Sequence, residues 1–596
     1  MVASYQRAQL IEIFPSHSFI GDKEEQGSKY TRYPIGVYRS KPSVFLSKVP
    51  VRKLFSMQQA ELSGEPPGPH EDMPNTIPEA YAGPHGKEWR ASVKREFDSI
   101  TNLGVYVLSL LPKGMRALDC KTVFKIKYNR DYTIDKFKTT ICVRGFRQKQ
   151  GEEYHETFAP TVQLASVRVL LSLIVQHRLK PFQWDVGTAF LYSELEGDVD
   201  IYVRAPEGLR QYDQHGAELY WHLRKAIYGL KQAPRAWNQT MTRWLKSYGF
   251  EQSVSDSGLF VYNKLGIICI LSLYVDDIPG GCNCDKFLTQ LYSDLSKDFA
   301  MTKKDKLDFL LGIEIDIDAD GDMILHQSKY IHDCIERFGL KGHSAVIPMD
   351  PNFQISIKGT AKDDKLSGDQ KRDLSKRYKS MIGALLWISR STRPDIAFAV
   401  SVLCRYTHDP KLRHMQAIEQ VFYYLLGTAS LGLFYTKSET DPQLTAFCDA
   451  DYANDIDNRK STSGMMVFLG NNLVSWSSNK QSLVATSTTE AEYISLSSMA
   501  KEVLFLRQLL ESINYCVLLT TKIYADNMAA NFLARNAKLT TRSKHFDIRL
   551  HHIRDLVERK IVEVHDIAST NNISDCLTKP LARPILENLR EFYLTA

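Results

Sequence analysis

Two adjacent carboxylates at the end of an apolar run constrain this chain more than any other feature. The run at residues 267–271 is followed by Tyr-Val-Asp-Asp at 274–277 and by the turn-forming Pro-Gly-Gly at 279–281. Neighbouring acids raise each other's pKa, so two of them at a tight turn are costly for folding alone. Mg²⁺ relieves that cost because it binds carboxylates together with substrate phosphates. The stretch predicts a divalent-metal site at a strand end, and a solvated hairpin tip is the alternative.

Polymerases contain such sites, in which two metals about 4 Å apart hold the attacking and leaving oxygens of a phosphoryl transfer. The four-residue motif at 274–277 is only a hypothesis when taken alone. A third carboxylate on another buried strand, together with a basic surface for a polyanion, is needed to favour a polymerase.

The charge distribution supplies a candidate basic surface. The net charge of the 596 residues is only +6, which permits nucleic-acid binding without requiring it. Between residues 121 and 149, however, nine Lys or Arg stand against two Asp and alternate with aromatic residues. That mixture is typical of a nucleic-acid surface, and a solvated strand pair is the alternative.

Cysteines and hydropathy limit the class of protein. Ten cysteines are scattered, and the close pair Cys282 and Cys284 has no second Cys or His pair at zinc-site spacing. We therefore expect reduced thiols. No apolar run approaches the roughly 18 residues that a membrane-spanning helix needs, and the first residues lack the apolar core of a signal peptide. An intracellular, soluble protein with no membrane partner is expected.

The length predicts three or four domains. Residues 1–77 read as a linker or tail, and folding should begin near Pro78. We expect a helix through residues 93–97, a hairpin of strands 121–128 and 138–144, and a helix at 166–175 that leads into Asp185. Residues 321–440 are largely helical by pattern. Strands at 444–449, 465–469 and 473–476, with helices after them, predict a separate α/β domain.

Several short motifs, taken together, resemble one family. From about residue 78 to 581, in matching order, the chain is similar to the reverse transcriptase and RNase H region of copia-type LTR retrotransposon Pol polyproteins. Integrase, protease and nucleocapsid parts are not recognisable, so we expect Met1 to open a truncated copy or an incomplete gene model. The matching motifs lie at residues 144–148, 156–160, 185–191, 205–208, 228–237, 274–277, 311–314 and 392–396.

The resemblance implies an α/β (α+β) fold: a right-hand polymerase with fingers, palm and thumb, then a connection and an RNase H-like domain. The implied boundaries are fingers and palm at 78–320, thumb and connection at 321–440, the RNase H-like domain at 441–581 and a C-terminal tail at 582–596.

The resemblance also assigns a polymerase site. It implies Asp185, Asp276 and Asp277 as catalytic metal ligands for two Mg²⁺ ions, or Mn²⁺, with a helix cap or turn as the alternative for Asp185. The implied nucleotide-binding residues are Phe190 under the sugar, Tyr228 and Gly229 in the loop against the base, and Lys138. The alternative for Phe190 is an ordinary core residue.

A second site is implied near the C-terminus. Asp449, Glu490, Asp526 and Asp575 match RNase H carboxylates that hold two metals. Asp451, Glu492 and Asp547 are nearby alternatives that spacing does not exclude. His545, His551 and His552 could assist product or metal release, with ordinary packing as the alternative.

The implied partners are an RNA template, a DNA primer, RNA–DNA hybrid and deoxynucleoside triphosphates, in a homo- or heterodimer. The implied location is the cytoplasm, in a virus-like particle if the element is complete, with nuclear passage. A catalytically silent or repurposed remnant that binds nucleic acid is the rival hypothesis. A cellular telomerase or intron-type polymerase is disfavoured by the RNase H unit.

Three positions depart from the family pattern. Lys138-Thr139-Thr140 stands where relatives carry Lys-Ala-Arg, and Tyr192-Ser193 replaces Asn-Gly. Pro279 lies in a strand that is usually aliphatic, and proline cannot donate to a sheet ladder. None of these changes removes a predicted metal ligand.

Overall fold

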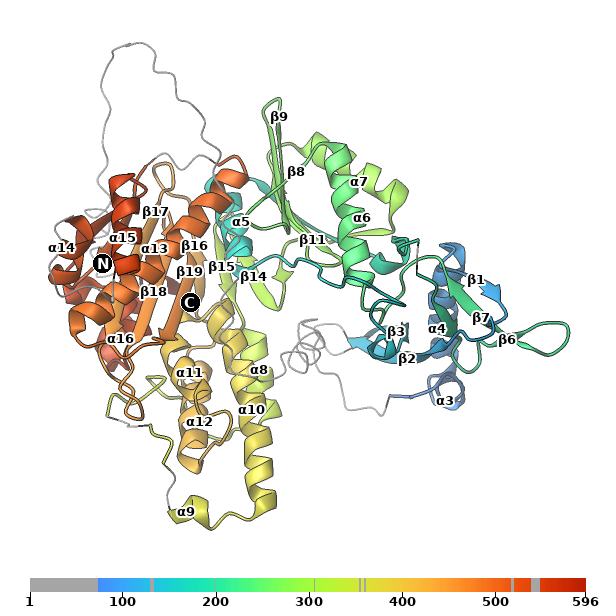
Figure 1. The fold of residues 1–596 in the computed structure, drawn as a ribbon, viewed down its shortest axis with the longest axis horizontal. Helices are drawn as coiled ribbons and strands as arrows, with labels where there is room; N and C mark the ends of the chain where they lie inside the picture. The colour runs from blue at the N-terminus through green and yellow to red at the C-terminus, as the bar shows by residue number, and fades with distance from the viewer. Residues whose placement is uncertain are drawn as a thin grey trace. The chain divides into compact units, whose positions relative to one another are not determined.

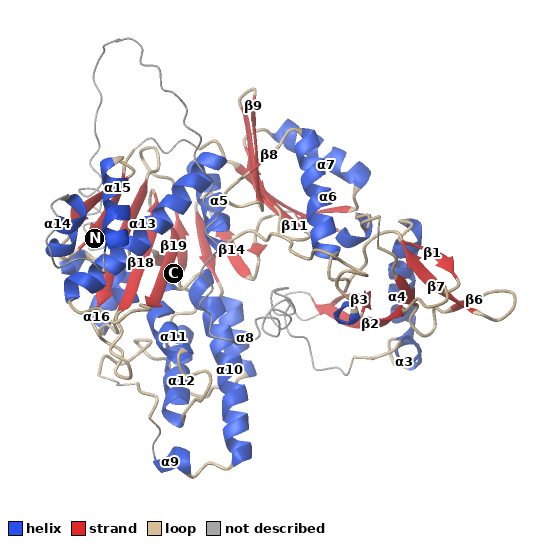
Figure 2. Cartoon of the chain, viewed as in Figure 1, coloured by secondary structure: helices blue, strands red, loops and turns tan. Residues whose placement is uncertain are grey.

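The fold is that of a computed structural model, which describes residues 73–128, 133–197, 199–304, 306–352, 355–358, 361–515, 519–536 and 547–596. The chain divides into residues 1–63 and a compact unit of residues 64–596, to which all described residues belong. The expected linker at residues 1–77 therefore lies almost wholly outside the described part. The fold is mixed α/β, as predicted, and the strands of the described residues form four sheets (Figure 2).

The first sheet contains the basic hairpin. Its strand order is β1 (Tyr106–Ser109), β7 (Glu218–Leu223), β5 (Tyr202–Arg204), β2 (Ala117–Tyr128) and β3 (Ile134–Val143), and β6 (Gln211–Tyr212) pairs with β7. Helix α4 (Gly86–Asn102) buries Trp89, Val93 and Ile100 at helical spacing and contacts β3. The short helix α3 (Ile77–Ala82) precedes it, and the Thr76 hydroxyl caps its first turn. The predicted hairpin and helix are confirmed.

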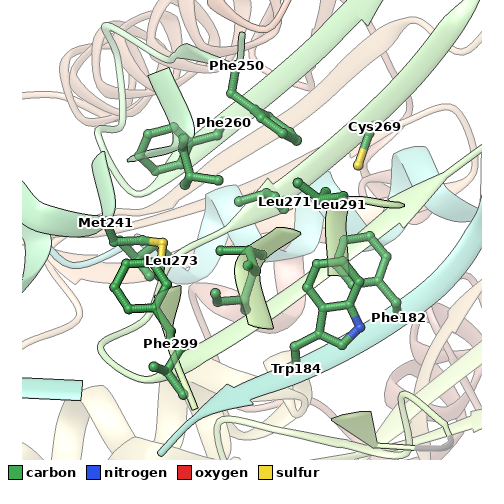
Figure 3. Close-up of a cluster of buried hydrophobic side chains, with 14 of the residues drawn as sticks. Phe182, Trp184, Met241, Phe250, Phe260, Cys269, Leu271, Leu273, Leu291 and Phe299 are labelled. Carbon is green, nitrogen blue, oxygen red and sulfur yellow. The ribbon is translucent and has the colours of Figure 1, made fainter. Parts of the chain in front are cut away.

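The second sheet, which we name the palm sheet, carries the acidic hairpin. Its order is β12 (Met301–Lys304), β4 (Lys180–Val186), β11 (Asp277–Cys282), β10 (Ile267–Ser272), β9 (Leu259–Lys264) and β8 (Glu251–Gln252). Aromatic and aliphatic side chains of the sheet, including Trp184 and Leu271, form one core with α6 (Ala233–Tyr248) and α7 (Asp285–Asp298) (Figure 3). Figure 1 shows both helices beside β11. Helix α5 (Leu164–Gln176), close to its predicted bounds, also contacts β10 and β11.

The third sheet joins segments from three of the expected domains. Its order is β13 (Phe309–Leu310), β14 (Ile313–Ile317), β15 (Met323–His326), β16 (Gly432–Tyr435) and β22 (Leu594–Thr595). The helices between β15 and β16 are α8 (Ser328–Arg337), α9 (Ala361–Asp364), α10 (Gly368–Ser391), α11 (Ala397–Cys404) and α12 (Leu412–Gly427). Residues 321–440 are thus largely helical, as expected, with a strand near each end.

The expected C-terminal tail at residues 582–596 is ordered structure instead. It forms helix α16 (Arg583–Arg590) and strand β22, and it buries Leu586, Leu589 and Tyr593. The Arg590 guanidinium donates to the Tyr424 hydroxyl at 3.0 Å. These two elements were not expected from the sequence, because an eight-residue amphipathic helix and a two-residue strand are too short to give a clear periodic pattern.

The fourth sheet has the order β19 (Asn472–Lys480), β18 (Thr462–Leu469), β17 (Leu444–Asp451), β20 (Thr521–Ala525) and β21 (Val562–Asp566). The first three strands are antiparallel, whereas β17, β20 and β21 are parallel. Helices α13 (Thr488–Ser512), α14 (Met528–Arg535) and α15 (Asp547–Glu558) pack with one another, and α13 contacts β17 and β18. The predicted strands in this region are confirmed. Across the described residues, every helix is too short or too polar to cross a membrane.

Candidate active sites

The acidic hairpin brings three predicted carboxylates to one edge of the palm sheet. Tyr274 and Asp277 exchange backbone hydrogen bonds of 2.9 and 3.0 Å, so Val275 and Asp276 form a two-residue turn. Strand β4 ends beside this turn: Asp185 is the cross-strand partner of Asp277, and the Val186 N–H donates to the Asp276 carbonyl at 2.9 Å. Asp185 therefore lies at a strand end, opposite the acidic pair.

The acidic turn has a strained backbone and is stabilised by a hydrogen bond from helix α6. Val275 has a φ of 56°, a left-handed conformation that is unusual for a β-branched residue and is found mainly at functional sites. The indole N–H of Trp237, from α6, donates to the Val275 carbonyl. The sequence contains Trp237 in a matching motif but gave no sign of this contact, because it joins residues 38 positions apart.

Burial and the neighbouring carboxylates disfavour the ionised forms of Asp276 and Asp185. Burial, followed by the charges of Asp185 and Asp277, raises the pKa of Asp276 to about 6. Burial and the Asp277 charge also raise the pKa of Asp185, against the opposing effect of Lys304. The Lys304 ammonium lies 3.6 Å from an Asp277 oxygen. A bound cation would relieve this repulsion, as expected of a metal site.

The unusual strand after the acids fits the sheet. Hydrogen-bonded pairs alternate along an antiparallel ladder, and the bond between Val186 and Asp276 makes Pro279 and Gln183 a non-hydrogen-bonded pair. The ladder between β4 and β11 therefore needs no N–H donor at Pro279. A Cβ on Gly280 would lie 2.6 Å from the Ile270 carbonyl, and one on Gly281 would lie 2.5 Å from Ile174 of α5. The glycines allow close packing on both sides of β11.

The predicted nucleotide-binding residues lie around the same edge. The ring of Phe190, in the 3₁₀ turn η2 (Ala189–Tyr192), is 5.0 Å from the ring of Tyr228. Burial, followed by the charges of Glu96, Asp276 and Asp185, raises the pKa of Tyr228. Gly229 has a φ of 92°, and a Cβ there would lie 2.0 Å from the Val143 carbonyl. Only glycine fits this close approach.

Lysines of the basic hairpin face each other across its strands. Lys125 is the partner of Lys138, and Lys127 is the partner of Lys136. Like charges directly opposite each other destabilise a strand pair. The charges of Lys138 and Lys127 also oppose the rise in the pKa of Asp185. This face of the hairpin is therefore suited to a polyanion that lies near the acids.

A second carboxylate group lies in the fourth sheet. Oxygens of Asp449 on β17, Glu492 on α13 and Asp526 after β20 all lie within 4.8 Å of one another. Burial first, then Asp449 and Asp526, raises the pKa of Glu492 to about 9. Burial and Asp575 raise that of Asp449 to about 7. Among the described residues, one buried oxygen each of Glu492 and Asp575 lacks a hydrogen-bond partner, so the group offers free ligand atoms to a cation.

The structure does not bring Glu490 into this group. The Glu490 carboxylate accepts hydrogen bonds from the Thr486 N–H at 2.6 Å and from its hydroxyl at 2.5 Å, beside the Ser487 cap of α13. Positions two apart on a helix differ by about 200°. Glu490 and Glu492 therefore point to nearly opposite sides of α13, and Glu492, one of the sequence alternatives, faces the sheet.

Asp575 borders the group from the 3₁₀ turn η5 (Ile573–Leu577). Its carboxylate lies 3.0 Å from the Lys579 ammonium, and the Thr578 hydroxyl after the turn donates to Asp449. Asp451, another alternative, lies at the end of β17, and burial raises its pKa.

The structure does not place the three predicted histidines or Asp547, the remaining alternative acid, at the carboxylate group within its described residues. His545 and the Asp547 side chain lie outside the described residues. His551 and His552 are on α15. Burial lowers the pKa of His552, and the charges acting on it come from Lys501 and Asp555.

Fold and sites together define an α/β protein with two separate carboxylate clusters, one of them beside a basic hairpin. The family model described as reverse transcriptase (RNA-dependent DNA polymerase) matches residues 103–351. The Pol polyprotein of tobacco (Nicotiana tabacum) transposon TNT 1-94 is 35% identical over 87% of this chain and 38% of its own length. The putative transposon Ty5-1 protein of Saccharomyces cerevisiae is 30% identical over 54% of this chain and all of its own length.

The chain belongs to the copia-type retrotransposon Pol polyprotein family. It spans about a third of the length of the plant transposon polyproteins that it matches. A solved foamy viral protease-reverse transcriptase in complex with RNA/DNA hybrid is 11% identical, with a TM-score of 0.38, over 87% of this chain and 63% of that one.

Proposed function

We propose that this chain copies RNA into DNA by nucleotidyl transfer at the palm sheet. The observation that carries the proposal is the cross-strand pairing of Asp185 with Asp277, which places both beside Asp276 at a strained turn. Membership of the reverse transcriptase family supports it. The substrates would be an RNA template, a DNA primer and deoxynucleoside triphosphates, and the enzyme could work as a homo- or heterodimer.

The residues present fit a divalent metal, because clustered, partly desolvated carboxylates with raised pKa values are suited to Mg²⁺ or Mn²⁺. Asp185, Asp276 and Asp277 would hold it. When bound, such ions help to activate the primer 3′-hydroxyl and neutralise the leaving pyrophosphate. Lys138 would bind the triphosphate, and the Phe190 ring would lie under the sugar and exclude a 2′-hydroxyl. Gly229 would let the backbone approach the incoming base.

Primer extension on an RNA template tests this proposal. The purified chain should extend a DNA primer with Mg²⁺, and the double variant Asp276→Asn with Asp277→Asn should lose extension by at least about 10³-fold, as expected when charge stabilisation is removed. Asp285→Asn is the matched control, since Asp285 is an exposed acid paired with Lys180 on the same sheet. If the unmodified chain fails to extend the primer, the silent-remnant hypothesis is favoured.

We propose a second activity, cleavage of RNA in RNA–DNA hybrids, at the carboxylate group of the fourth sheet. The supporting observation is the convergence of Asp449, Glu492 and Asp526 with unpartnered oxygens on Glu492 and Asp575. We assign Glu492, in place of Glu490, to the ligand set. Mg²⁺ bound there would activate water, while Lys579 and Thr578 hold Asp575 and Asp449 in position.

Asp449→Asn tests the second activity. Hybrid cleavage should be lost while primer extension is retained, because Asp449 lies on a different sheet from Asp185. Asp555→Asn, an exposed acid on α15 that pairs with Arg559, is the control. Unchanged cleavage in Asp449→Asn would refute the assignment.

A further inference from the structure

Two cysteines face each other inside the palm sheet, although the sequence pointed only to Cys282 and Cys284 as a close pair. Cys269 of β10 is the cross-strand partner of Cys282 of β11. The Asn283 N–H donates to the Ile268 carbonyl at 3.1 Å, so the alternation of the ladder makes Cys269 and Cys282 a non-hydrogen-bonded pair. In such pairs the Cα atoms are about 4.5 Å apart and the side chains approach most closely.

This position suits a disulfide, whose Cα atoms are usually about 4.4–6.8 Å apart. Both residues have free thiols in the structure. The side-chain hydrogen bond from Cys269 lowers the pKa of Cys282 to about 7, while burial raises that of Cys269 well above its usual value. One sulfur is therefore the better nucleophile, and the other remains a thiol.

We propose that Cys269 and Cys282 form a redox modification site that closes into a cross-strand disulfide when the protein meets a hydroperoxide. The Cys282 thiolate attacks one peroxide oxygen, the O–O bond breaks, and hydroxide leaves, which gives a sulfenic acid. The Cys269 sulfur then attacks the Cys282 sulfur. The S–S bond forms, the S–O bond breaks, and the thiol proton leaves with the hydroxyl as water. Two thiols and one hydrogen peroxide thus give one disulfide and two waters.

Burial favours a small oxidant. Cys269 is 0% and Cys282 is 1% exposed, so any oxidant, even one the size of water, reaches either sulfur only when the strands open locally. Hydrogen peroxide, which is close to water in size, needs a smaller opening than a bulky disulfide such as oxidised glutathione. Cys284 is partly exposed, and its N–H lies 3.4 Å from the Cys282 sulfur, which places Cys282 just beneath the surface.

The disulfide would join the two strands where their ladder is incomplete. Pro279 has no N–H to offer at the hydrogen-bonded position opposite Ser272, so β10 and β11 share one bond fewer near the acidic turn. Strand β11 begins at Asp277. Oxidation would therefore fix covalently the strand that carries a proposed catalytic acid, and this inference holds whether or not the chain is an active polymerase.

Peptide mapping tests the proposal directly. The folded full-length chain is treated with hydrogen peroxide, the peroxide is removed, the remaining free thiols are alkylated after the chain has been unfolded in urea, and the digest is analysed by mass spectrometry. We expect a linked peptide pair that contains Cys269 and Cys282, with alkylation of both falling together and returning after dithiothreitol. Cys284→Ser should leave the linkage intact. Protein that is oxidised after unfolding in urea serves as the control for random disulfide pairing.

The order of attack is tested with a sulfenic-acid trap. When dimedone is added as the peroxide-treated chain is unfolded in urea, it should label Cys282 in Cys269→Ser, and it should not label Cys269 in Cys282→Ser. Peptide mapping of the unmodified chain tests the linkage even if these variants fold poorly. A linkage between Cys282 and Cys284, or thiols at 269 and 282 that stay fully alkylatable after native oxidation, would overturn the proposal.

Discussion

The indole N–H of Trp237 donates to the carbonyl of Val275, the left-handed residue that precedes Asp276 in the acidic turn. Trp237 is 1% exposed and belongs to the core of the palm sheet. Helix α6 thereby supports a turn whose backbone conformation is unfavourable for valine. The strained turn is held by a buried contact rather than by its own sequence.

Trp237→Phe should slow primer extension without abolishing it. The ring still fills the core, but the Val275 carbonyl loses a hydrogen bond worth about 0.5–1.5 kcal/mol, which corresponds to a rate loss of up to about tenfold. Single-turnover extension measures the effect. The matched control is Trp244→Phe, which removes an indole hydrogen bond to Asp298 at 2.7 Å, away from the turn. Equal rates in the two variants would contradict the positioning role of Trp237.

Phe190→Ala should relax discrimination against ribonucleotides. The ring lies beside Tyr228, whose pKa is raised in part by the charges of Asp276 and Asp185, and removing the ring should open space for a 2′-hydroxyl. We expect the ratio of ribonucleotide to deoxyribonucleotide incorporation to rise by about tenfold or more, because a lost steric clash is worth at least about 1.4 kcal/mol. Tyr192→Phe, which changes a neighbouring aromatic residue without removing its ring, is the control. An unchanged ratio would favour an ordinary core role for Phe190.

Local patterns were sufficient to predict much of this fold. The apolar run before Asp276 and the apolar helix before Asp185 gave the right elements because each is decided by burial within one segment. The convergence of Asp185 with Asp277 depends on strand register, which no local pattern contains. The family resemblance supplied that relationship, and the structure is consistent with it.

Other features could not be read from local sequence. Glu490 and Glu492 stand in one short acidic motif of α13. Only the packing of α13 on the sheet determines that Glu492, and not Glu490, faces the carboxylate group. The pairing of Cys269 with Cys282 likewise depends on register across a hairpin. Helix α16 is held by long-range contacts such as that between Arg590 and Tyr424, which a reading of neighbouring residues does not detect.

Gly280→Ala should destabilise the fold by about 1–3 kcal/mol, the usual cost of overpacking. The new methyl group would lie 2.6 Å from the Ile270 carbonyl and 2.9 Å from Leu271 Cβ, and backbone of a central strand cannot move aside cheaply. Denaturant unfolding measures the change. The control is Gly383→Ala in α10, where a Cβ meets nothing within 4 Å and helix propensity predicts a gain of about 0.5–1 kcal/mol. Equal stabilities in the two variants would contradict the packing argument.

Glu492→Gln and Glu490→Gln form a matched pair two residues apart on one helix. Glu492→Gln should abolish hybrid cleavage, since Glu492 lies within the carboxylate group. Glu490→Gln should retain most of it, with a small loss of stability from its bonds to Thr486. Cleavage of a labelled hybrid and thermal melting separate the two effects. The reverse pattern, with cleavage lost only in Glu490→Gln, would restore the original sequence-based choice.

Without metal, the fold should lose stability as pH rises from about 5 to 9. Burial and the neighbouring acids raise the folded-state pKa of Glu492 to about 9, whereas the unfolded carboxyl has its ordinary pKa of about 4.3. The folded state therefore holds a proton that the unfolded state releases, and its stabilising effect disappears as pH rises through the folded pKa. Thermal melting in EDTA should show this decline, and Glu492→Gln should weaken it because glutamine does not titrate. Adding Mg²⁺ at pH 8.5 should raise the melting temperature of the unmodified chain more than that of the variant. A melting curve equally dependent on pH in both proteins would show that Glu492 does not carry the effect.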